Sequence, residues 1–229
     1  MLTYIYVSTY ILVLHCVLAI VCIVVLLMSL FICFNVIIVS LGIEYYHWLA
    51  EAMKHTFAMR MFLGDPDYNV TATTTAAFNA LLDDVYMSSL AKMSSSDHAL
   101  DLSMYGGVYN TTHYIQEDHG TSHVSVIDQY GNTVALTTTA NTEFGSKVIS
   151  NSTGLLFNNQ MDDFSIPNVT NYFGLFPSPY NYPEPKKKPL SSMSPSILLD
   201  KKGRVVLVGG ASGGPRIITG TAQVISILI

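Results

Sequence analysis

The sequence predicts an α+β fold preceded by a hydrophobic transmembrane helix. Residues 1–43 contain no Asp, Glu, Lys or Arg, and they exceed the roughly 20 residues that a helix needs to cross a bilayer. Two stretches with helical character follow at 44–63 and 74–93, and two β-rich pairs lie at 123–139 and 196–208. Helices and antiparallel pairs in separate parts of a chain are typical of the α+β class.

The apolar N-terminal segment is interpreted as a membrane anchor. Residues 10–43 are almost wholly apolar, and they lack the basic region and cleavage-site pattern of a signal peptide. A hydrophobic signal or an artefact of gene prediction is the alternative. Four Asn-x-Ser/Thr sequons follow, at Asn69, Asn110, Asn151 and Asn168, and they favour an extracellular catalytic part.

Two helices are predicted after this segment. The first, 44–63, ends at Gly64-Asp65-Pro66, a run that breaks helices. His47 and His55 on it are interpreted as surface or partly packed, because no third metal ligand is near them. The second helix, 74–93, offers a core face made of Ala76, Ala77, Ala80, Leu81, Leu82 and Val85.

The most informative stretch is a Gly-Thr pair just before an alternating strand. Gly120-Thr121 precedes a strand at 123–128, a turn at 129–132 and a second β-rich segment at 133–139. This is how an N-terminal-nucleophile enzyme looks before it cleaves itself. Cleavage at Gly120-Thr121 would give Thr121 a free α-amine, so that nucleophile and general base share one residue. The simpler interpretation is a turn before a strand.

The C-terminal part reads as a loop, a hairpin and a helix. Residues 173–189 are Pro-rich and form a long loop, of the kind that often acts as a lid. A hairpin is predicted from 196–199 and 205–208 across the turn 200–203. Gly213-Gly214-Pro215 then precedes a helical or apolar stretch that runs to Ile229.

Composition excludes several classes of function. The chain has 229 residues and a net charge of -5, which argues against nucleic-acid binding because that usually needs a basic face. Its three cysteines, Cys16, Cys22 and Cys33, all lie in the apolar segment, so we expect neither a disulfide framework nor a metal cluster. No ligand spacing suits a catalytic metal, and no cofactor is expected.

Five motifs in order resemble the small catalytic subunit of gamma-glutamyltransferase, also called glutathione hydrolase. The match runs from about Asp118 to the C-terminus and is weaker over 45–68. The motifs are Asp118-His119-Gly120-Thr121-Ser122-His123, then Asn141 with Phe144-Gly145-Ser146-Lys147, then the run 154–164, then Pro189-Leu190-Ser191-Ser192-Met193-Ser194-Pro195, and last the Gly-rich run 209–214.

The resemblance implies a fold and a division of the chain. The family's fold is an N-terminal-nucleophile αββα sandwich, in which two stacked sheets lie between helices. We expect three parts: the transmembrane or signal-like segment 1–43, the end of a large-subunit-like region at 44–120, and a truncated small-subunit-like region at 121–229. Self-processing at Gly120-Thr121 would produce the large and small subunits of a heterodimer.

The resemblance also implies roles for individual residues. Thr121 is the nucleophile, Thr139 orients its hydroxyl, and the backbone N–H groups of Gly213 and Gly214 form the oxyanion hole. The substrate's α-amine is expected at Asn141, Gln160 and Asp163, where some family members have Glu in place of Gln160. The α-carboxylate is expected at the hydroxyls of Ser191 and Ser192. Taken alone, Thr139 would pass as a strand residue, and Ser191-Ser192 would pass as turn residues.

The implied activity is cleavage of the γ-glutamyl bond of glutathione and its conjugates. A threonyl γ-glutamyl ester would pass its acyl group to water or to an amino-acid or dipeptide acceptor. Eukaryotic members are glycosylated type II membrane proteins, so we expect a single-pass protein of the plasma membrane with an extracellular catalytic part.

The resemblance fails at one residue and at both ends. The family's large subunit supplies an arginine for the substrate carboxylate, and none of Arg60, Arg204 and Arg216 stands in that motif. Strands are missing at both ends, which predicts exposed sheet edges and a fragment or mispredicted gene product. Two other functions stay open: a catalytically silent membrane glycoprotein, and a different N-terminal-threonine amidohydrolase such as an aspartylglucosaminidase-like enzyme.

Overall fold

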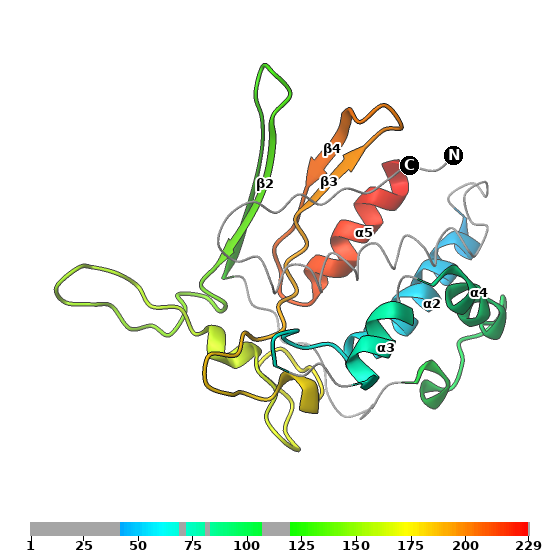
Figure 1. The fold of residues 1–229 in the computed structure, drawn as a ribbon, viewed down its shortest axis with the longest axis horizontal. Helices are drawn as coiled ribbons and strands as arrows, with labels where there is room; N and C mark the ends of the chain where they lie inside the picture. The colour runs from blue at the N-terminus through cyan, green and yellow to red at the C-terminus, as the bar shows by residue number, and fades with distance from the viewer. Residues whose placement is uncertain (1–41, 69–71, 81–82, 107–119, 229) are drawn as a thin grey trace.

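A computed structural model describes residues 42–68, 72–80, 83–106 and 120–228. Helices gather in one part of the structure, and two β-hairpins project side by side next to helix α5 (Figure 1). Among the described residues, no helix is both long and apolar enough to cross a bilayer. The predicted anchor at 1–43 lies almost wholly outside them. The α+β content is therefore confirmed for the described part of the chain.

Helix α2, Ile43–Arg60, forms where the first helix was predicted. Glu44 lies in its first turn and Arg60 in its last, an arrangement that complements the helix dipole. One face is buried at the spacing of a packed helix, and its members are Tyr45, Leu49, Ala52, Thr56 and Met59. The chain turns away at Met61, close to the predicted end.

The single helix predicted at 74–93 is wrong, because the structure has two helices there. Helix α3 spans Ala72–Ala80 and helix α4 spans Asp84–Met93. Between them Asp83 is extended, and its carboxylate accepts hydrogen bonds from the N–H groups of Val85 and Tyr86. Such an N-cap starts a new helix. Val85, expected in the core, is 78% exposed, and Met87 and Leu90 are buried instead.

The main hydrophobic core lies where α2, α4 and α5 meet. The stretch after the glycine pair, expected to be helical or simply apolar, is helix α5, Arg216–Leu228. Ile218 and Ala222 of α5 pack with Met59 of α2 and Met87 of α4. Leu190, just before the paired serines, belongs to the same cluster. The last turn of α2 and the segment around Leu190 are therefore packed into the same core.

The two predicted hairpins are confirmed. Strands β1, Thr121–Ile127, and β2, Thr133–Thr139, pair antiparallel with Thr121 opposite Thr139. Strands β3, Ser196–Leu199, and β4, Val205–Gly209, form the second pair. β4 contacts both β1 and β2, and Leu198 and Leu207 pack with Ile225 of α5. The register places two threonine hydroxyls together at the start of β1.

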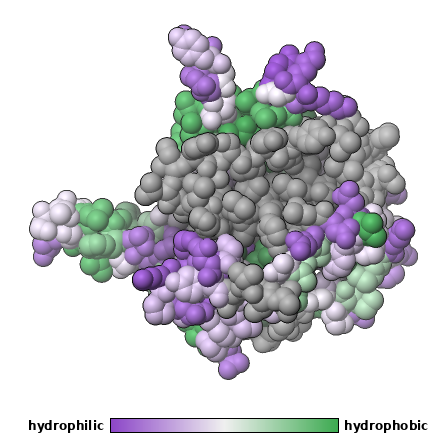
Figure 2. All heavy atoms as spheres, viewed as in Figure 1, coloured by the Kyte–Doolittle hydropathy of each residue, from purple (hydrophilic) through white to green (hydrophobic). Residues whose placement is uncertain are grey.

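Each sheet in the described residues has two strands, so the full layers of the αββα sandwich are not present in that part. Several apolar side chains on the first hairpin are half exposed: Val124, Val126, Val134 and Leu136. Figure 2 shows hydrophobic surface at the base of the projecting hairpins and hydrophilic tips. One face of this hairpin therefore carries exposed apolar side chains, and the expectation that the sheet is incomplete stays a prediction.

The Pro-rich loop is tied to the chain that follows α2. It contains one turn of 3-10 helix, η4, at Pro179–Asn181. Ser178 donates from its hydroxyl to the carbonyl oxygen of Met61, and Tyr68 donates to that of Pro185. The buried carboxylate of Asp65 accepts a hydrogen bond from the backbone N–H of Lys188. These contacts hold the loop in place over the end of α2, and its predicted role as a lid stays a prediction.

Candidate active site

The predicted site residues converge on one cavity, although they come from separate elements. They reach it from the hairpin β1–β2, from the 3-10 helix η3 at Gln160–Asp163, from the loop before β3 and from the start of α5. Its lining includes Thr121, Thr139, Asn141, Gln160, Asp163, Ser191, Ser192 and Gly214. Gly213 precedes Gly214 but does not line the cavity.

Thr121 lies at the first position of β1, opposite Thr139 of β2. Their hydroxyl oxygens are 2.9 Å apart, within hydrogen-bonding distance. The Thr139 hydroxyl also donates to the carbonyl oxygen of Gly120 at 3.2 Å, and it accepts from the N–H of Asn141 at 2.8 Å. One hydroxyl therefore contacts both sides of the Gly120-Thr121 peptide bond.

Gly120 fits its place because it has no side chain. A Cβ atom there would lie 2.3 Å from the carbonyl oxygen of Thr142 and 2.6 Å from that of Asn141. Both distances are too short for any real contact. The Gly120 carbonyl oxygen also accepts from the N–H of Ala140 at 3.0 Å. The residue before Thr121 is thus pressed against the end of β2 and held by its backbone.

Asn141 connects the nucleophile to the run 154–164. It adopts the left-handed conformation, with φ at 78°, which asparagine tolerates better than most residues. Its side-chain NH2 donates to the carbonyl oxygen of Asn159, and the Asn159 side-chain oxygen accepts from Thr142. Strain of this kind collects at functional sites and persists where neighbours hold it.

Gln160 and Asp163 lie at the two ends of helix η3. The Gln160 side-chain NH2 donates to the Asp163 carboxylate, and Asp163 also accepts from Asn181 at its backbone oxygen. Burial raises the pKa of the Asp163 carboxyl to about 7, while the nearby positive charge of Arg60 and the Gln160 hydrogen bond oppose that rise. A partly buried carboxyl of this kind is suited to receive a cationic group.

Ser191 and Ser192 lie in the loop before β3. The Ser191 hydroxyl oxygen accepts a hydrogen bond from the N–H of Met193. The Ser192 hydroxyl oxygen accepts from the Arg60 guanidinium at 3.1 Å, and the Ser191 carbonyl oxygen lies 3.5 Å from the same nitrogen. Both hydroxyl oxygens therefore serve as acceptors to the protein, and each O–H is left as a donor towards the cavity.

Gly213 and Gly214 lead into α5 with positive φ angles of 122° and 57°. Their carbonyl oxygens accept from the N–H groups of Arg216 and Ile217. Within the described part of the chain, neither glycine N–H donates a hydrogen bond. A Cβ on Gly214 would also lie 3.2 Å from the Phe173 ring. Two free N–H groups at a helix start can receive a developing negative charge.

Sequence reasoning missed two residues of the site. Arg60 stands in no carboxylate-binding motif, yet it is buried at the cavity wall beside Ser192. Asn181 lies in the Pro-rich loop, and its side chain joins the backbone of Asp163 to that of Leu190. One sequence feature could have indicated Arg60: it lies in the last turn of α2, just before the Gly64-Asp65-Pro66 break.

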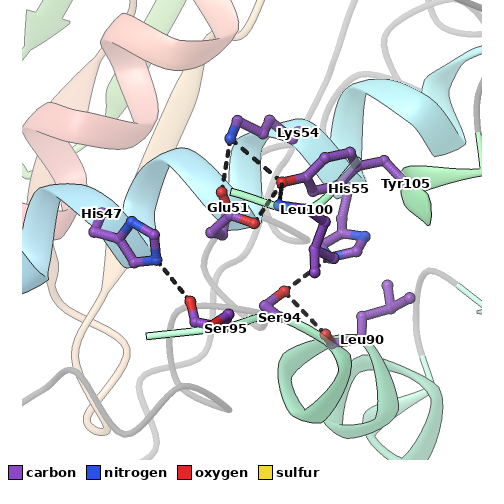
Figure 3. Close-up of polar contacts among 9 residues, drawn as sticks. All are labelled: His47, Glu51, Lys54, His55, Leu90, Ser94, Ser95, Leu100 and Tyr105. Carbon is purple, nitrogen blue, oxygen red and sulfur yellow. Dashed lines mark hydrogen bonds and ion pairs between the residues drawn. The ribbon is translucent and has the colours of Figure 1, made fainter. Parts of the chain in front are cut away.

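A second polar cluster lies on another face of α2 (Figure 3). Glu51 accepts from Lys54 and from the Tyr105 hydroxyl, and His55 is hydrogen-bonded to Ser94. His55 is 1% exposed, so the expectation that it lies at the surface or is partly packed is wrong. Across the ranges that the structure describes, no three His, Cys, Asp or Glu side chains form a possible metal site. The cluster attaches residues 94–105 to α2.

Comparison with known proteins agrees with these motifs. The family model described as gamma-glutamyltranspeptidase matches residues 18–229. Glutathione hydrolase 2 of Arabidopsis thaliana is 44% identical over 180 residues, which cover 78% of this chain and 30% of that protein. The chain thus spans about a third of the length of such relatives.

The chain is also similar to a shorter relative and to a protein of solved structure. The protein named "Putative inactive glutathione hydrolase 4" of Arabidopsis thaliana is 42% identical over 166 residues, covering 72% of this chain and 83% of that one. The crystal structure of the T380A mutant of Helicobacter pylori gamma-glutamyltranspeptidase shares 50% identity, with a TM-score of 0.44, over 45% of this chain and 56% of that one.

Proposed function

This chain belongs to the gamma-glutamyltranspeptidase family, and we propose that it cleaves the γ-glutamyl bond of glutathione and its conjugates. The observation that carries the proposal is the cavity in which Thr121 and Thr139 face Asp163, Ser191 and Ser192. A nucleophile lies there beside one acidic group and two hydroxyl donors. This combination suits an amino acid that carries an amine, a carboxylate and a reactive amide.

The first step of the proposal is self-cleavage at Gly120-Thr121. The Thr121 oxygen attacks the Gly120 carbonyl carbon, which is polarised by the Thr139 hydroxyl. The C–N bond breaks as the nitrogen gains the hydroxyl proton, and Gly120 becomes an ester on Thr121. Water then hydrolyses this ester, which leaves a Gly120 carboxylate and a Thr121 with a free α-amine. The products are the proposed large and small subunits, which stay together as a heterodimer.

The second step is acyl transfer at the exposed Thr121. Its α-amine accepts the hydroxyl proton while the oxygen attacks the γ-amide carbon of the substrate. The N–H of Gly214, which lines the cavity, and that of Gly213 directly before it are the proposed oxyanion donors, and such donors typically contribute about 3 kcal/mol each. The amine leaves with the proton, and a γ-glutamyl ester remains on Thr121. Water, an amino acid or a dipeptide then attacks the ester and restores the hydroxyl.

The substrate's amino-acid group is held by opposite charges and dipoles in this proposal. Its α-ammonium donates to Asp163, Gln160 and Asn141, and its α-carboxylate accepts from Ser191 and Ser192. Binding of the ammonium favours the ionised form of Asp163 and so offsets the cost of burying that carboxylate.

A denaturing gel with intact mass of the expressed chain tests the proposal. Wild type is expected to yield a fragment that begins at Thr121, and Thr121→Ala is expected to stay whole because the attacking oxygen is gone. Thr133→Ala, at the far end of β2, is the matched control and should cleave normally. Turnover of a γ-glutamyl anilide follows on the processed protein. Wild type that remains a single chain and is inert would refute the activity.

A second candidate function is a catalytically silent member of the same family. The favouring observation is the similarity to "Putative inactive glutathione hydrolase 4", of which this chain covers 83%. In that case the cavity and its hydrogen bonds would persist without cleavage. The gel described above separates the two candidates, because only the active one produces the Thr121 fragment.

For localisation, we propose a single-pass plasma-membrane protein with an extracellular catalytic part. Support comes from the uncharged residues 1–43 and from two sequons, Asn151 and Asn168, that are exposed in the structure. Treatment of the protein from cultured cells with an N-glycosidase should lower its mass, and Asn151→Gln with Asn168→Gln should reduce that shift. An unglycosylated protein in the soluble fraction would contradict this localisation.

A further inference from the structure

The buried side chain of Arg60 acts on polar groups at both ends of the cavity. Arg60 is 5% exposed, and it is the one Lys or Arg side chain among the described residues that lines this cavity. Its guanidinium donates to the Ser192 hydroxyl on one side, and its charge acts on the Asp163 carboxyl on the other. Its Nε atom has no hydrogen-bond partner in the described structure. A buried guanidinium without full pairing is costly and calls for a functional reason.

The hydrogen bond between Arg60 and Ser192 has a fixed direction. An arginine can only donate, so the Ser192 oxygen must accept from it. The single proton of the Ser192 hydroxyl is then directed elsewhere, and it can donate to an anion in the cavity. Ser191 is set in the same way by the N–H of Met193. Without Arg60, the Ser192 proton would have no fixed direction, so the hydroxyl would be less well oriented to donate to a carboxylate.

Charge balance links Arg60 to the other end of the cavity. Among the described residues, the charged groups that act on the Asp163 carboxyl are Arg60 of α2, which favours its ionised form, and Asp162 of η3, which disfavours it. Gln160 adds a hydrogen bond that favours ionisation. Removal of the Arg60 charge therefore leaves a partly buried carboxyl that resists ionisation, and a neutral carboxyl binds an ammonium poorly.

We propose that Arg60 is a positioning residue that makes the cavity selective for ligands with both an α-ammonium and an α-carboxylate. It acts through the Ser192 hydroxyl at the carboxylate end and through the charge of Asp163 at the ammonium end. The inference rests on the proposed function, because that function defines which ligand the cavity takes. The ligand class is an L-α-amino acid with a γ-acyl group.

Binding of two probes to the full chain tests this role. L-glutamate has both groups, and γ-aminobutyrate is the same molecule without the α-carboxylate. Titration calorimetry is carried out on wild type, Arg60→Met, Arg60→Lys and the control Arg204→Met. Arg204 pairs with Asp200 in an exposed turn, so its loss should change nothing. Arg60→Met is expected to weaken glutamate binding about 10- to 100-fold. It should weaken γ-aminobutyrate binding by less, because that probe loses only the contribution of Asp163 at the ammonium end.

Two further readouts separate positioning from simple loss of structure. The pH at which glutamate binding is half lost on acidification should be higher in Arg60→Met than in wild type. Arg60→Lys should restore the wild-type value, because the positive charge is kept. In a double-mutant cycle, Arg60→Met should cost less affinity when Ser192 is already Ala, because their effects run through one hydroxyl. If Arg60→Met does not fold, Arg60→Lys still tests the geometry, since its single ammonium is expected to lose part of the selectivity.

The outcomes distinguish this inference from the proposed activity. Glutamate binding without turnover, with selectivity lost in Arg60→Met, refutes the activity and supports the role of Arg60. Turnover by wild type with unchanged selectivity in the Arg60 variants refutes the role of Arg60 alone. Equal weakening of both probes also refutes it, because the Ser192 hydroxyl would then contribute nothing to binding of the α-carboxylate. A folded wild type that binds no glutamate overturns both.

Discussion

Thr139 offers the sharpest test of how the cleavage site is built. Its hydroxyl contacts the Thr121 oxygen, the Gly120 carbonyl oxygen and the Asn141 N–H, at 2.9, 3.2 and 2.8 Å. Thr139→Val keeps the branched shape but removes all three contacts. The variant therefore loses both the hydroxyl that we propose orients Thr121 and the donor to the Gly120 carbonyl oxygen.

The expected size of the effect follows from these contacts. Loss of one donor to a developing oxyanion costs about 10²- to 10³-fold in rate, so cleavage should slow by that order. Asn141 is 6% exposed, so its unpaired N–H should lower the free energy of unfolding by about 1–3 kcal/mol.

A time course of intact mass after synthesis measures the rate, and thermal unfolding measures the stability. Thr139→Ser, which keeps the hydroxyl, is the control and should cleave within a few-fold of wild type. A Thr139→Val chain that cleaves as fast as wild type would show that this hydroxyl does not assist the reaction.

Three further predictions concern the same site. Gly120→Ala should slow cleavage and destabilise the fold, because its Cβ would meet two carbonyl oxygens within 2.6 Å. Gly220→Ala, in open space on α5, is the control and should raise the free energy of unfolding by about 0.5–1 kcal/mol; thermal melts of both variants measure the difference. The pKa of Asp163 in the folded protein, about 7, is raised above its unfolded value, so its contribution to the stability of the ligand-free protein is largest at low pH and falls as the pH rises towards 7. Thermal melts from pH 4.5 to 7.5 should show this loss in wild type and not in Asp163→Asn. Asn181→Ala should lower the free energy of unfolding by about 1–3 kcal/mol, because it unpairs the buried Leu190 N–H, whereas Asn132→Ala in an exposed turn should have little effect in urea titrations.

Local patterns were sufficient where an element depends on its own residues. The hairpin β1–β2 follows from alternation on both sides of a turn, and the helix α5 follows from the glycine pair and the apolar run after it. The division of 74–93 into two helices was missed because helical periodicity continues through Asp83, while the Asp83 carboxylate caps a new start. Competition between a cap and a continuing helix is decided by a few hydrogen bonds, which periodicity does not report.

The site residues that sequence reasoning found are those that stand in recognisable motifs. Thr121, Asn141, Gln160, Asp163 and the paired serines line one cavity, although up to 71 positions separate them. Arg60 belongs to no such motif, and it reaches the site because α2 packs against α5 and Leu190 in one core. Its role depends on which hydroxyl lies next to it, and that is a property of packing.

The sequence by itself determined the family and the two hairpins, and it predicted Thr121 as the nucleophile, because each of these depends on contiguous residues. The tertiary structure alone decided that Arg60 faces Ser192, that Asn181 joins Asp163 to Leu190 and that His55 is buried. Contacts between distant segments depend on how helices and loops pack around a shared core. Buried charge and hydrogen-bond direction then follow from that packing, because most polar groups that are removed from water are paired inside the protein.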